Sequence, residues 1–209
     1  MIIRAVTLFY PVEGDKINAN DLRQELTKLR SVIEGVGRER GIEIRTWRVT
    51  LPFTDPSWNF EELSTTVGRL SGDLGYIHAS LNIPMGSRFE LDRVVNSFIK
   101  SGSYLSIWVG DLRELDDYNV ELFVDVLRRL VELDQWILSR RIAALIGDAI
   151  LTPYYPDSIN LGNRHGVALS ILYPGELSSE QSLRNDLARV FRAAEDVGKE
   201  IASELGVDY

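Results

Sequence analysis

One long segment, residues 151–166, gathers many of the side chains that could do chemistry. It contains hydroxyl, carboxylate, guanidinium and imidazole groups, which are Thr152, Tyr155, Asp157, Ser158, Arg164 and His165. Tyrosine, carboxylate and imidazole groups commonly transfer protons in enzymes, so Tyr155, Asp157 and His165 are the catalytic candidates. A long segment without hydrophobic periodicity favours a functional loop, and a plug rich in proline and tyrosine that packs the domain or an interface explains it equally well.

A second segment, residues 80–88, has the composition of an anion-binding loop. Asn82, Ser87 and Arg88 stand here together with a glycine, just before an amphipathic stretch. The backbone N–H groups at the start of a helix can cradle an anion. A helix cap with a tight turn is the simpler explanation of the same residues.

The two segments together define one hypothetical ligand site. Ligands of parallel α/β sheets collect at the carboxyl ends of the strands, and we expect both segments to meet there. Arg88 and Arg164 would hold a carboxylate or a phosphate as bidentate donors. The remaining polar contacts would come from Asn82, Ser87, Thr152 and Ser158.

Other chemistries have less support. The acidic residues within 111–117 could hold Mg²⁺, but acids before a helix also suit the helix dipole, and we predict no metal site. The glycine patterns of nucleotide-binding loops and the G-x-S-x-G elbow of hydrolases are absent from the sequence. The sequence therefore indicates no particular cofactor.

The composition excludes several classes of protein. Cysteine is absent and only two histidines are present, which excludes disulfides, thiolate chemistry and a multi-histidine metal site within one chain. The net charge of −8 disfavours binding to nucleic acid. No apolar run reaches the ~20 residues of a membrane span and no signal peptide precedes the first strand, so we expect a cytoplasmic protein. Arginine far outnumbers lysine, which weakly indicates a thermophile.

Strand-like and helix-like segments alternate along the chain. This alternation implies right-handed crossovers and a mainly parallel sheet, so we predict a single α/β domain over residues 1–209. It consists of five β-α units. Their predicted strands are Ile2–Phe9, Ile42–Leu51, Tyr76–Ile83, Tyr104–Val109 and Gly166–Tyr173.

The sequence defines some of the predicted helices more clearly than others. The first runs from about residue 21 to residue 40, with Asn18 or Asn20 as its cap and apolar residues at every third or fourth position. The stretch 119–146 is predicted to be helical, either as one long helix or as two with a break near Asp134.

The end of the chain repeats an earlier pattern. Arg40-Gly41-Ile42 leads from a helix into a strand, and Leu205-Gly206-Val207 repeats this helix exit. We therefore expect five β-α units at the threshold of a sixth, as in one half of a larger architecture. Such a half would expose apolar side chains and strand edges. The expected partner is a second copy in a twofold homodimer or a separately encoded second half.

The order of several short motifs resembles one protein family. Ile3-Arg4-Ala5-Val6-Thr7 is followed by Ser80-Leu81-Asn82-Ile83, by Thr152-Pro153-Tyr154-Tyr155-Pro156 and by His165-Gly166. None of these motifs is specific by itself. In this order they resemble the N-terminal half of the domain of unknown function 711 family, whose uncharacterised members are similar in fold to the barrel of pyruvate formate-lyase.

The resemblance implies a fold but no reaction. It implies a barrel of two five-stranded parallel halves packed antiparallel, of which this chain would be one half. The glycyl-radical chemistry of pyruvate formate-lyase needs cysteine, which this chain lacks. Fold alone does not determine function.

Two functions from different classes follow from these observations. In the first, the protein is an enzyme or enzyme half that binds a small anionic metabolite at the carboxyl ends of the strands. In the second, it is a noncatalytic scaffold or binding subunit that completes a barrel with a partner chain. A ligand between the two loops would favour the first, and a loop buried against another chain would favour the second.

Overall fold

A computed structural model describes residues 1–12, 17–75, 78–111, 113–147, 159–172 and 183–209. Its elements alternate in the order that the sequence predicts over most of the chain. They are β1 (Ile2–Phe9), α1 (Ala19–Arg40), β2 (Glu43–Thr50), α2 (Phe60–Leu74), β3 (His78–Ile83), α3 (Leu91–Ser101), β4 (Tyr104–Gly110), α4 (Asp117–Glu132), the 3-10 helix η1 (Trp136–Arg141), β5 (Ile142–Ile146), β6 (Gly166–Leu172) and α5 (Leu183–Leu205).

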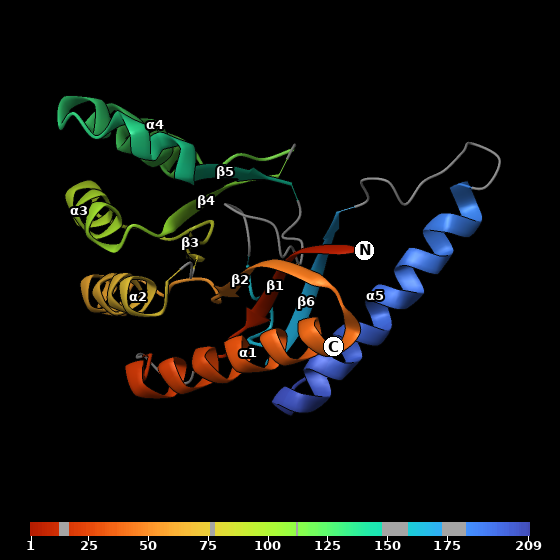
Figure 1. Cartoon of the computed structure of the whole chain (residues 1–209). Coiled ribbons are helices and arrows are strands. Elements are labelled where there is room, and N and C mark those ends of the chain that lie inside the picture. Colours follow the sequence, from red (N-terminus) through yellow and green to blue (C-terminus); the bar gives the residue numbers. More distant parts are fainter. Residues whose placement is uncertain (13–16, 76–77, 112, 148–158, 173–182) are drawn as a thin grey trace.

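The strands form one curled sheet in the order β5-β4-β3-β2-β1-β6 (Figure 1). The strands β1 to β5 are parallel, and β6 is antiparallel to β1. Helices α1 to α4 lie on one side of the sheet, so the sheet is a half-barrel with a convex face covered by helices and a concave face turned away from them. The prediction of an α/β domain with a mainly parallel sheet is confirmed.

The number of strands was predicted wrongly, because the sheet has six strands rather than five. The segment 119–146 is not helical throughout. Helix α4 ends at Glu132, Asp134 adopts a positive φ of 56°, and residues 142–146 form β5 beside β4. The apolar run Ile142-Ala143-Ala144-Leu145-Ile146 lacks a polar face, and periodicity alone does not distinguish such a short run from a buried helix. The predicted break near Asp134 is confirmed.

Strand β6 departs from the regular β-α pattern. It lies beside β1 at the other end of the sheet from β5 and runs antiparallel to β1, with Phe9 opposite Gly166. A parallel pair needs a long crossover, usually a helix, whereas an antiparallel strand does not. The strand therefore forms the antiparallel edge of an otherwise parallel sheet.

Helix α1 forms as the sequence predicts. The side chain of Asn18 accepts hydrogen bonds from the backbone N–H groups of Asn20 and Asp21, and Gly41 ends the helix in the left-handed conformation with φ 62°. Its apolar stripe packs into the core between the helices and the convex face of the sheet. The buried residues of this stripe are Leu22, Leu26, Leu29, Ile33 and Val36.

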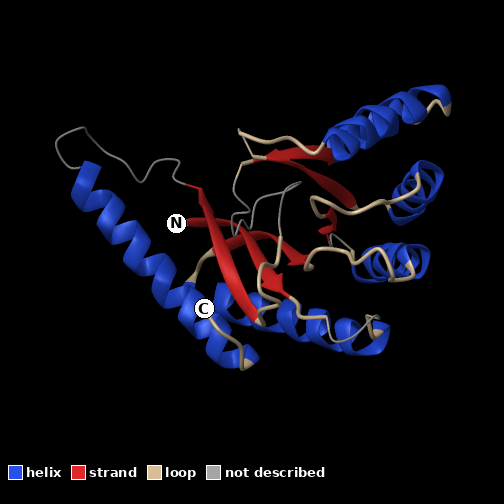
Figure 2. Ribbon diagram, turned by 180° about the vertical axis from the view of Figure 1, so that it is seen from behind, coloured by secondary structure: helices blue, strands red, loops and turns tan. Residues whose placement is uncertain are grey.

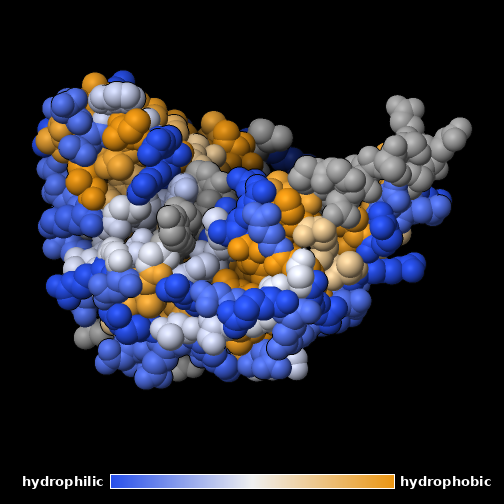
Figure 3. All heavy atoms as spheres, in the orientation of Figure 1, coloured by the Kyte–Doolittle hydropathy of each residue, from blue (hydrophilic) through white to orange (hydrophobic). Residues whose placement is uncertain are grey.

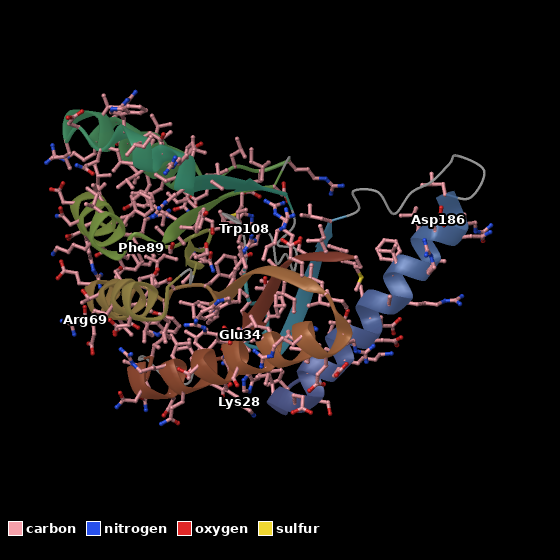
Figure 4. All side chains as sticks on the ribbon, in the orientation of Figure 1. Lys28, Glu34, Arg69, Phe89, Trp108 and Asp186 are labelled. Carbon is pink, nitrogen blue, oxygen red and sulfur yellow. The ribbon has the colours of Figure 1, made fainter. Side chains whose placement is uncertain are left out.

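The C-terminal half of helix α5 packs against the rest of the molecule. There it lies beside α1, while its N-terminal half, with Asp186, extends away from the rest of the molecule (Figures 2 and 4). Lys28 of α1 donates to the carbonyl oxygen of Leu205 at 2.6 Å, and Arg40 pairs with Glu200 at 2.5 Å. After the predicted exit at Gly206, Asp208 forms a parallel bridge with Gly166 at the start of β6.

Apolar side chains are also exposed at the corner formed by α4 and η1. Figure 3 shows apolar groups among hydrophilic ones over α4. None of the described helices combines the length and the apolar content needed to cross a bilayer. The exposed apolar residues of this corner, which we call the α4–η1 patch, are Val131, Leu133, Trp136 and Ile137.

Gly110 is predicted to be irreplaceable at the end of β4. It has a φ of +119°, and a Cβ atom there would lie 2.4 Å from the carbonyl oxygen of Glu114. We expect Gly110→Ala to lower the free energy of unfolding by about 2 kcal/mol or more. Gly35→Ala is the matched control, because this glycine lies inside α1 with no atom within 4 Å of the added Cβ; it should raise stability by about 0.5–1 kcal/mol. Urea denaturation of both variants measures the difference, and equal effects would contradict it.

Candidate functional site on the concave face of the sheet

Side chains alternate along the strands, and the concave face receives the polar ones. The apolar partners of this alternation, such as Val49, Leu81 and Ile107, belong to the core under the helices. The intervening positions include Phe9 and a set of buried small polar residues with one arginine. The polar set consists of Thr7, Arg48, Thr50, Ser80, Asn82, Ser106 and Ser170.

The strand register brings these polar residues side by side. Thr7 of β1 lies opposite Arg48 of β2, and Thr50 lies opposite Ser80 of β3. Asn82 of β3 lies opposite Ser106 of β4. Together they form a continuous band of hydrogen-bonding groups toward the carboxyl ends of four neighbouring strands, the place where parallel α/β sheets bind ligands. We call these residues, with Ser170, the concave band.

Arg48 supplies the charge of the concave band. Among the described residues it is the only charged one that is buried, with 8% of its surface exposed. Burying a guanidinium is costly unless the charge is compensated. Its planar group is suited to binding a carboxylate or a phosphate through two parallel hydrogen bonds.

Thr50 adds a second polar group beside Arg48. The two residues are two positions apart on β2, so their side chains leave the strand on the same face. Thr50 is fully buried, and its hydroxyl oxygen has no hydrogen-bond partner among the described residues. Buried polar groups are normally satisfied, and those that are not call for an explanation such as an unseen water or ligand.

Asn82, a predicted ligand-binding residue, is held firmly within the concave band. Its Oδ1 accepts hydrogen bonds from the hydroxyl groups of Ser80 at 2.8 Å and Ser106 at 2.6 Å. Its Nδ2 donates to the carbonyl oxygen of Leu51 at 2.9 Å. Asn82 therefore links the ends of three strands, and within the described structure one amide hydrogen remains for a ligand.

The other two residues of the first predicted loop make contacts within the protein. The hydroxyl of Ser87 donates to the carbonyl of Pro84 at 2.6 Å. Arg88 lies 3.5 Å from the carboxylate of Asp116 and stacks 4.5 Å from the ring centre of Tyr118. These contacts have the geometry of a tight turn attached to the start of α4. The turn does not cap the helix that follows it, because the N-cap residue of α3, Glu90, makes no side-chain capping hydrogen bond.

Asp116 is the residue on which this turn depends. Its carboxylate accepts hydrogen bonds from the backbone N–H groups of Gly86 at 2.7 Å and Asn119 at 3.3 Å. Burial by itself raises the pKa of the Asp116 carboxyl, but these hydrogen bonds and the charge of Arg88 outweigh burial, so the pKa lies below its usual value. Asp116 remains ionised at neutral pH and caps α4.

The second predicted segment is described only from residue 159 onward. Thr152, Tyr155, Asp157 and Ser158 lie outside the described residues. In the described part of this segment, Asn160 lies at the carboxyl ends of the strands. Its backbone N–H donates to the carbonyl of Leu51 at 3.0 Å, and its Nδ2 donates to the carbonyl of Tyr10 at 2.9 Å. Because Asn82 binds the same Leu51 carbonyl, the two predicted segments meet at this edge of the sheet.

His165 and Arg164 do not join Asn82 on the concave face. Gly166 pairs with Phe9, which alternates with core residues and faces the concave side, so the preceding His165 faces the helices. Its Nε2 lies 3.6 Å from Oε2 of Glu25 on α1. Arg164 is exposed.

Apart from Asn82, the residues that make the concave band a candidate site were not predicted from the sequence. Arg48 and Thr50 alternate with Trp47, Val49 and Leu51 in the predicted second strand, and this alternation was visible in the sequence. A strand that is buried on both faces usually carries apolar residues on both. The arginine and threonines on the second face of this strand were therefore a signal of a polar site. Asn160 belongs to the polar part of the second predicted segment, but only its contacts reveal its role, and Glu25 gave no signal of its own.

Metal binding has no support in the described part of the chain, where no group of three potential ligands from histidine, aspartate and glutamate comes together. No protein-family model matches the chain, and no curated protein is similar to it. A function of this protein is therefore inferred from the geometry of the concave band and its surroundings.

Asn160 is predicted to stabilise the carboxyl edge of the sheet. Besides its bond to Tyr10, its side chain donates to the carbonyl of Arg164 at 2.8 Å and accepts from the N–H of Arg164 at 2.9 Å. We expect Asn160→Ala to lower the free energy of unfolding by about 2–4 kcal/mol, because it leaves buried polar groups without partners. Asn96→Ala on the exposed face of α3 is the control and should change stability by less than about 0.5 kcal/mol. Similar losses in both variants, measured by chemical denaturation, would contradict this role.

Proposed function

We propose that the protein binds a small anionic metabolite on the concave face, at the carboxyl ends of β1 to β4. The observation that carries this proposal is the buried Arg48 beside the unpartnered hydroxyl of Thr50. A buried guanidinium among hydroxyl and amide groups provides one strong charged contact and several weaker directional ones. This combination fits a ligand with one carboxylate or phosphate group and further hydroxyl or carbonyl groups.

The proposal changes the residues that were first expected to hold the anion. Arg48 takes the place of Arg88 and Arg164, because Arg48 is buried among the polar groups of the concave band, whereas Arg88 lies at the turn before α3 and Arg164 is exposed. Asn82 keeps its proposed role in binding. Tyr155 and Asp157 remain candidates for acid–base chemistry, and an enzymatic role of the protein depends on them.

Binding should depend on the charge of Arg48. We expect inorganic phosphate or a small dicarboxylate such as malate to raise the melting temperature of the protein, and we expect Arg48→Met to abolish this rise. Arg48→Lys should retain part of it, because lysine keeps the charge but loses the bidentate geometry. Thermal-shift titrations with a panel of small anions provide the measurement.

Arg45→Met is the matched control for this experiment. Arg45 lies on the same strand but is exposed and pairs with Glu43 at 2.8 Å. Its loss removes the same charge and should leave the anion-induced shift unchanged. The proposal fails if no anion stabilises the wild-type protein, or if the two methionine variants lose the shift equally.

A second candidate function, a scaffold that completes a barrel with a partner chain, is supported by the open half-barrel. The described sheet ends in β5 on one side and β6 on the other, and the α4–η1 patch is exposed near β5. Unpaired strand edges and exposed apolar patches favour association. The resemblance to the domain of unknown function 711 family, in which a second half would complete the barrel, is consistent with this function and remains a proposal.

The favoured partner is a second copy of the chain. We expect light scattering at micromolar concentration to give the mass of a homodimer, with an interface on the order of 2,000 Å². Trp136→Glu in the α4–η1 patch should shift the protein toward monomer, whereas Phe191→Glu, at an exposed residue of α5, should do so only if that helix also belongs to the interface. A stable wild-type monomer would contradict the homodimer and leave a separately encoded second half as the partner to seek.

A further inference from the structure

A separate hollow lies on the helix-covered side of the sheet, at the start of α1. Its volume is about 540 Å³, within the range of small-molecule sites. It lies between the chain that follows β1, the first turns of α1 and the residue before β6. The lining residues are Tyr10, Pro11, Val12, Asn18, Asp21, Gln24, Glu25 and His165.

The charges around this hollow are opposite to those of the concave band. Asp21 and Glu25 stand one helical turn apart on α1, so both carboxylates lie on the same side of the helix. No lysine or arginine belongs to the described lining. An anion would be repelled here, whereas a positively charged group would be attracted.

Glu25 and His165 form a pair whose facing atoms are unsatisfied. Oε2 of Glu25 and Nε2 of His165 are closed to solvent and have no hydrogen-bond partner among the described residues, although they lie 3.6 Å apart. The two side chains as a whole remain 30% and 39% exposed, respectively. The other carboxylate oxygen and Nδ1 are not among the buried atoms, so a molecule in the hollow can reach them.

We propose that this hollow binds a small primary ammonium compound. The carboxylates of Glu25 and Asp21 neutralise the ammonium charge, and Nδ1 of His165 accepts a hydrogen bond from one of its N–H groups. Pro11 and Val12 provide an apolar wall for an alkyl chain. An ammonium group fits better than a metal ion, because the described residues bring no three metal ligands together.

Calorimetric titration with 1,4-diaminobutane tests this inference. We expect binding to the wild-type protein and at least about tenfold weaker binding to Glu25→Gln. His165→Gln should retain binding, because its amide oxygen can accept a hydrogen bond in place of the imidazole. Glu39→Gln, at an exposed acid near the other end of α1, is the matched control and should behave as the wild type.

Three results would overturn the inference. They are the absence of binding to the wild-type protein, equal binding by Glu25→Gln and Glu39→Gln, and Mg²⁺ binding that displaces the diamine, which would make the hollow a cation site of a different kind. Arg48→Met should keep diamine binding intact. A failure of anion binding on the concave face and a failure of this inference are therefore distinguishable.

Discussion

The carbonyl oxygen of Leu51, at the end of β2, is the point on which the carboxyl edge of the sheet depends. It accepts two hydrogen bonds, one from the backbone N–H of Asn160 at 3.0 Å and one from the side chain of Asn82 at 2.9 Å. Through Asn160 this point is connected to the end of β1 and the approach to β6, and through Asn82 to β3 and β4. Parallel strands that end at one edge leave their last polar groups without ladder partners, and two asparagines satisfy them here.

This arrangement also explains how a polar concave face is compatible with a stable sheet. Hydroxyl and amide groups that are buried without partners would cost about 1–3 kcal/mol each. Ser80 and Ser106 avoid this cost because both donate to Asn82. Thr50 has no such partner among the described residues, and it lies beside the buried charge of Arg48. The band is thus satisfied around Asn82 on β3 and β4, and the hydroxyl of Thr50 on β2 marks the place where we propose that a ligand binds.

The sequence predicts what is determined locally. The stripe and cap of α1 and the glycine exits at Gly41 and Gly206 depend on neighbours within one or two turns, and these predictions are confirmed. The strand β5 was missed because Ile142–Ile146 is apolar at every position, so only pairing with β4 reveals its extended form. The direction of β6 and the contacts of Asn160 depend on residues about 150 positions away in the sequence, and no local pattern contains that information.

The register of β6 decides which chemistry each face of the sheet receives. Gly166 pairs with Phe9 on one side and with the chain end on the other, where a Cβ atom would lie 2.9 Å from the carbonyl oxygen of Asp208. Because the side-chain period of a strand is two, this pairing directs His165 toward α1 and Glu25 rather than toward Arg48. A shift of the pairing by one residue would turn the side chains of both His165 and Val167 toward the concave face. Only glycine allows this close approach at position 166, so Gly166 helps to fix the register of β6. The register in turn keeps the acidic hollow and the concave band with Arg48 on opposite sides of the sheet.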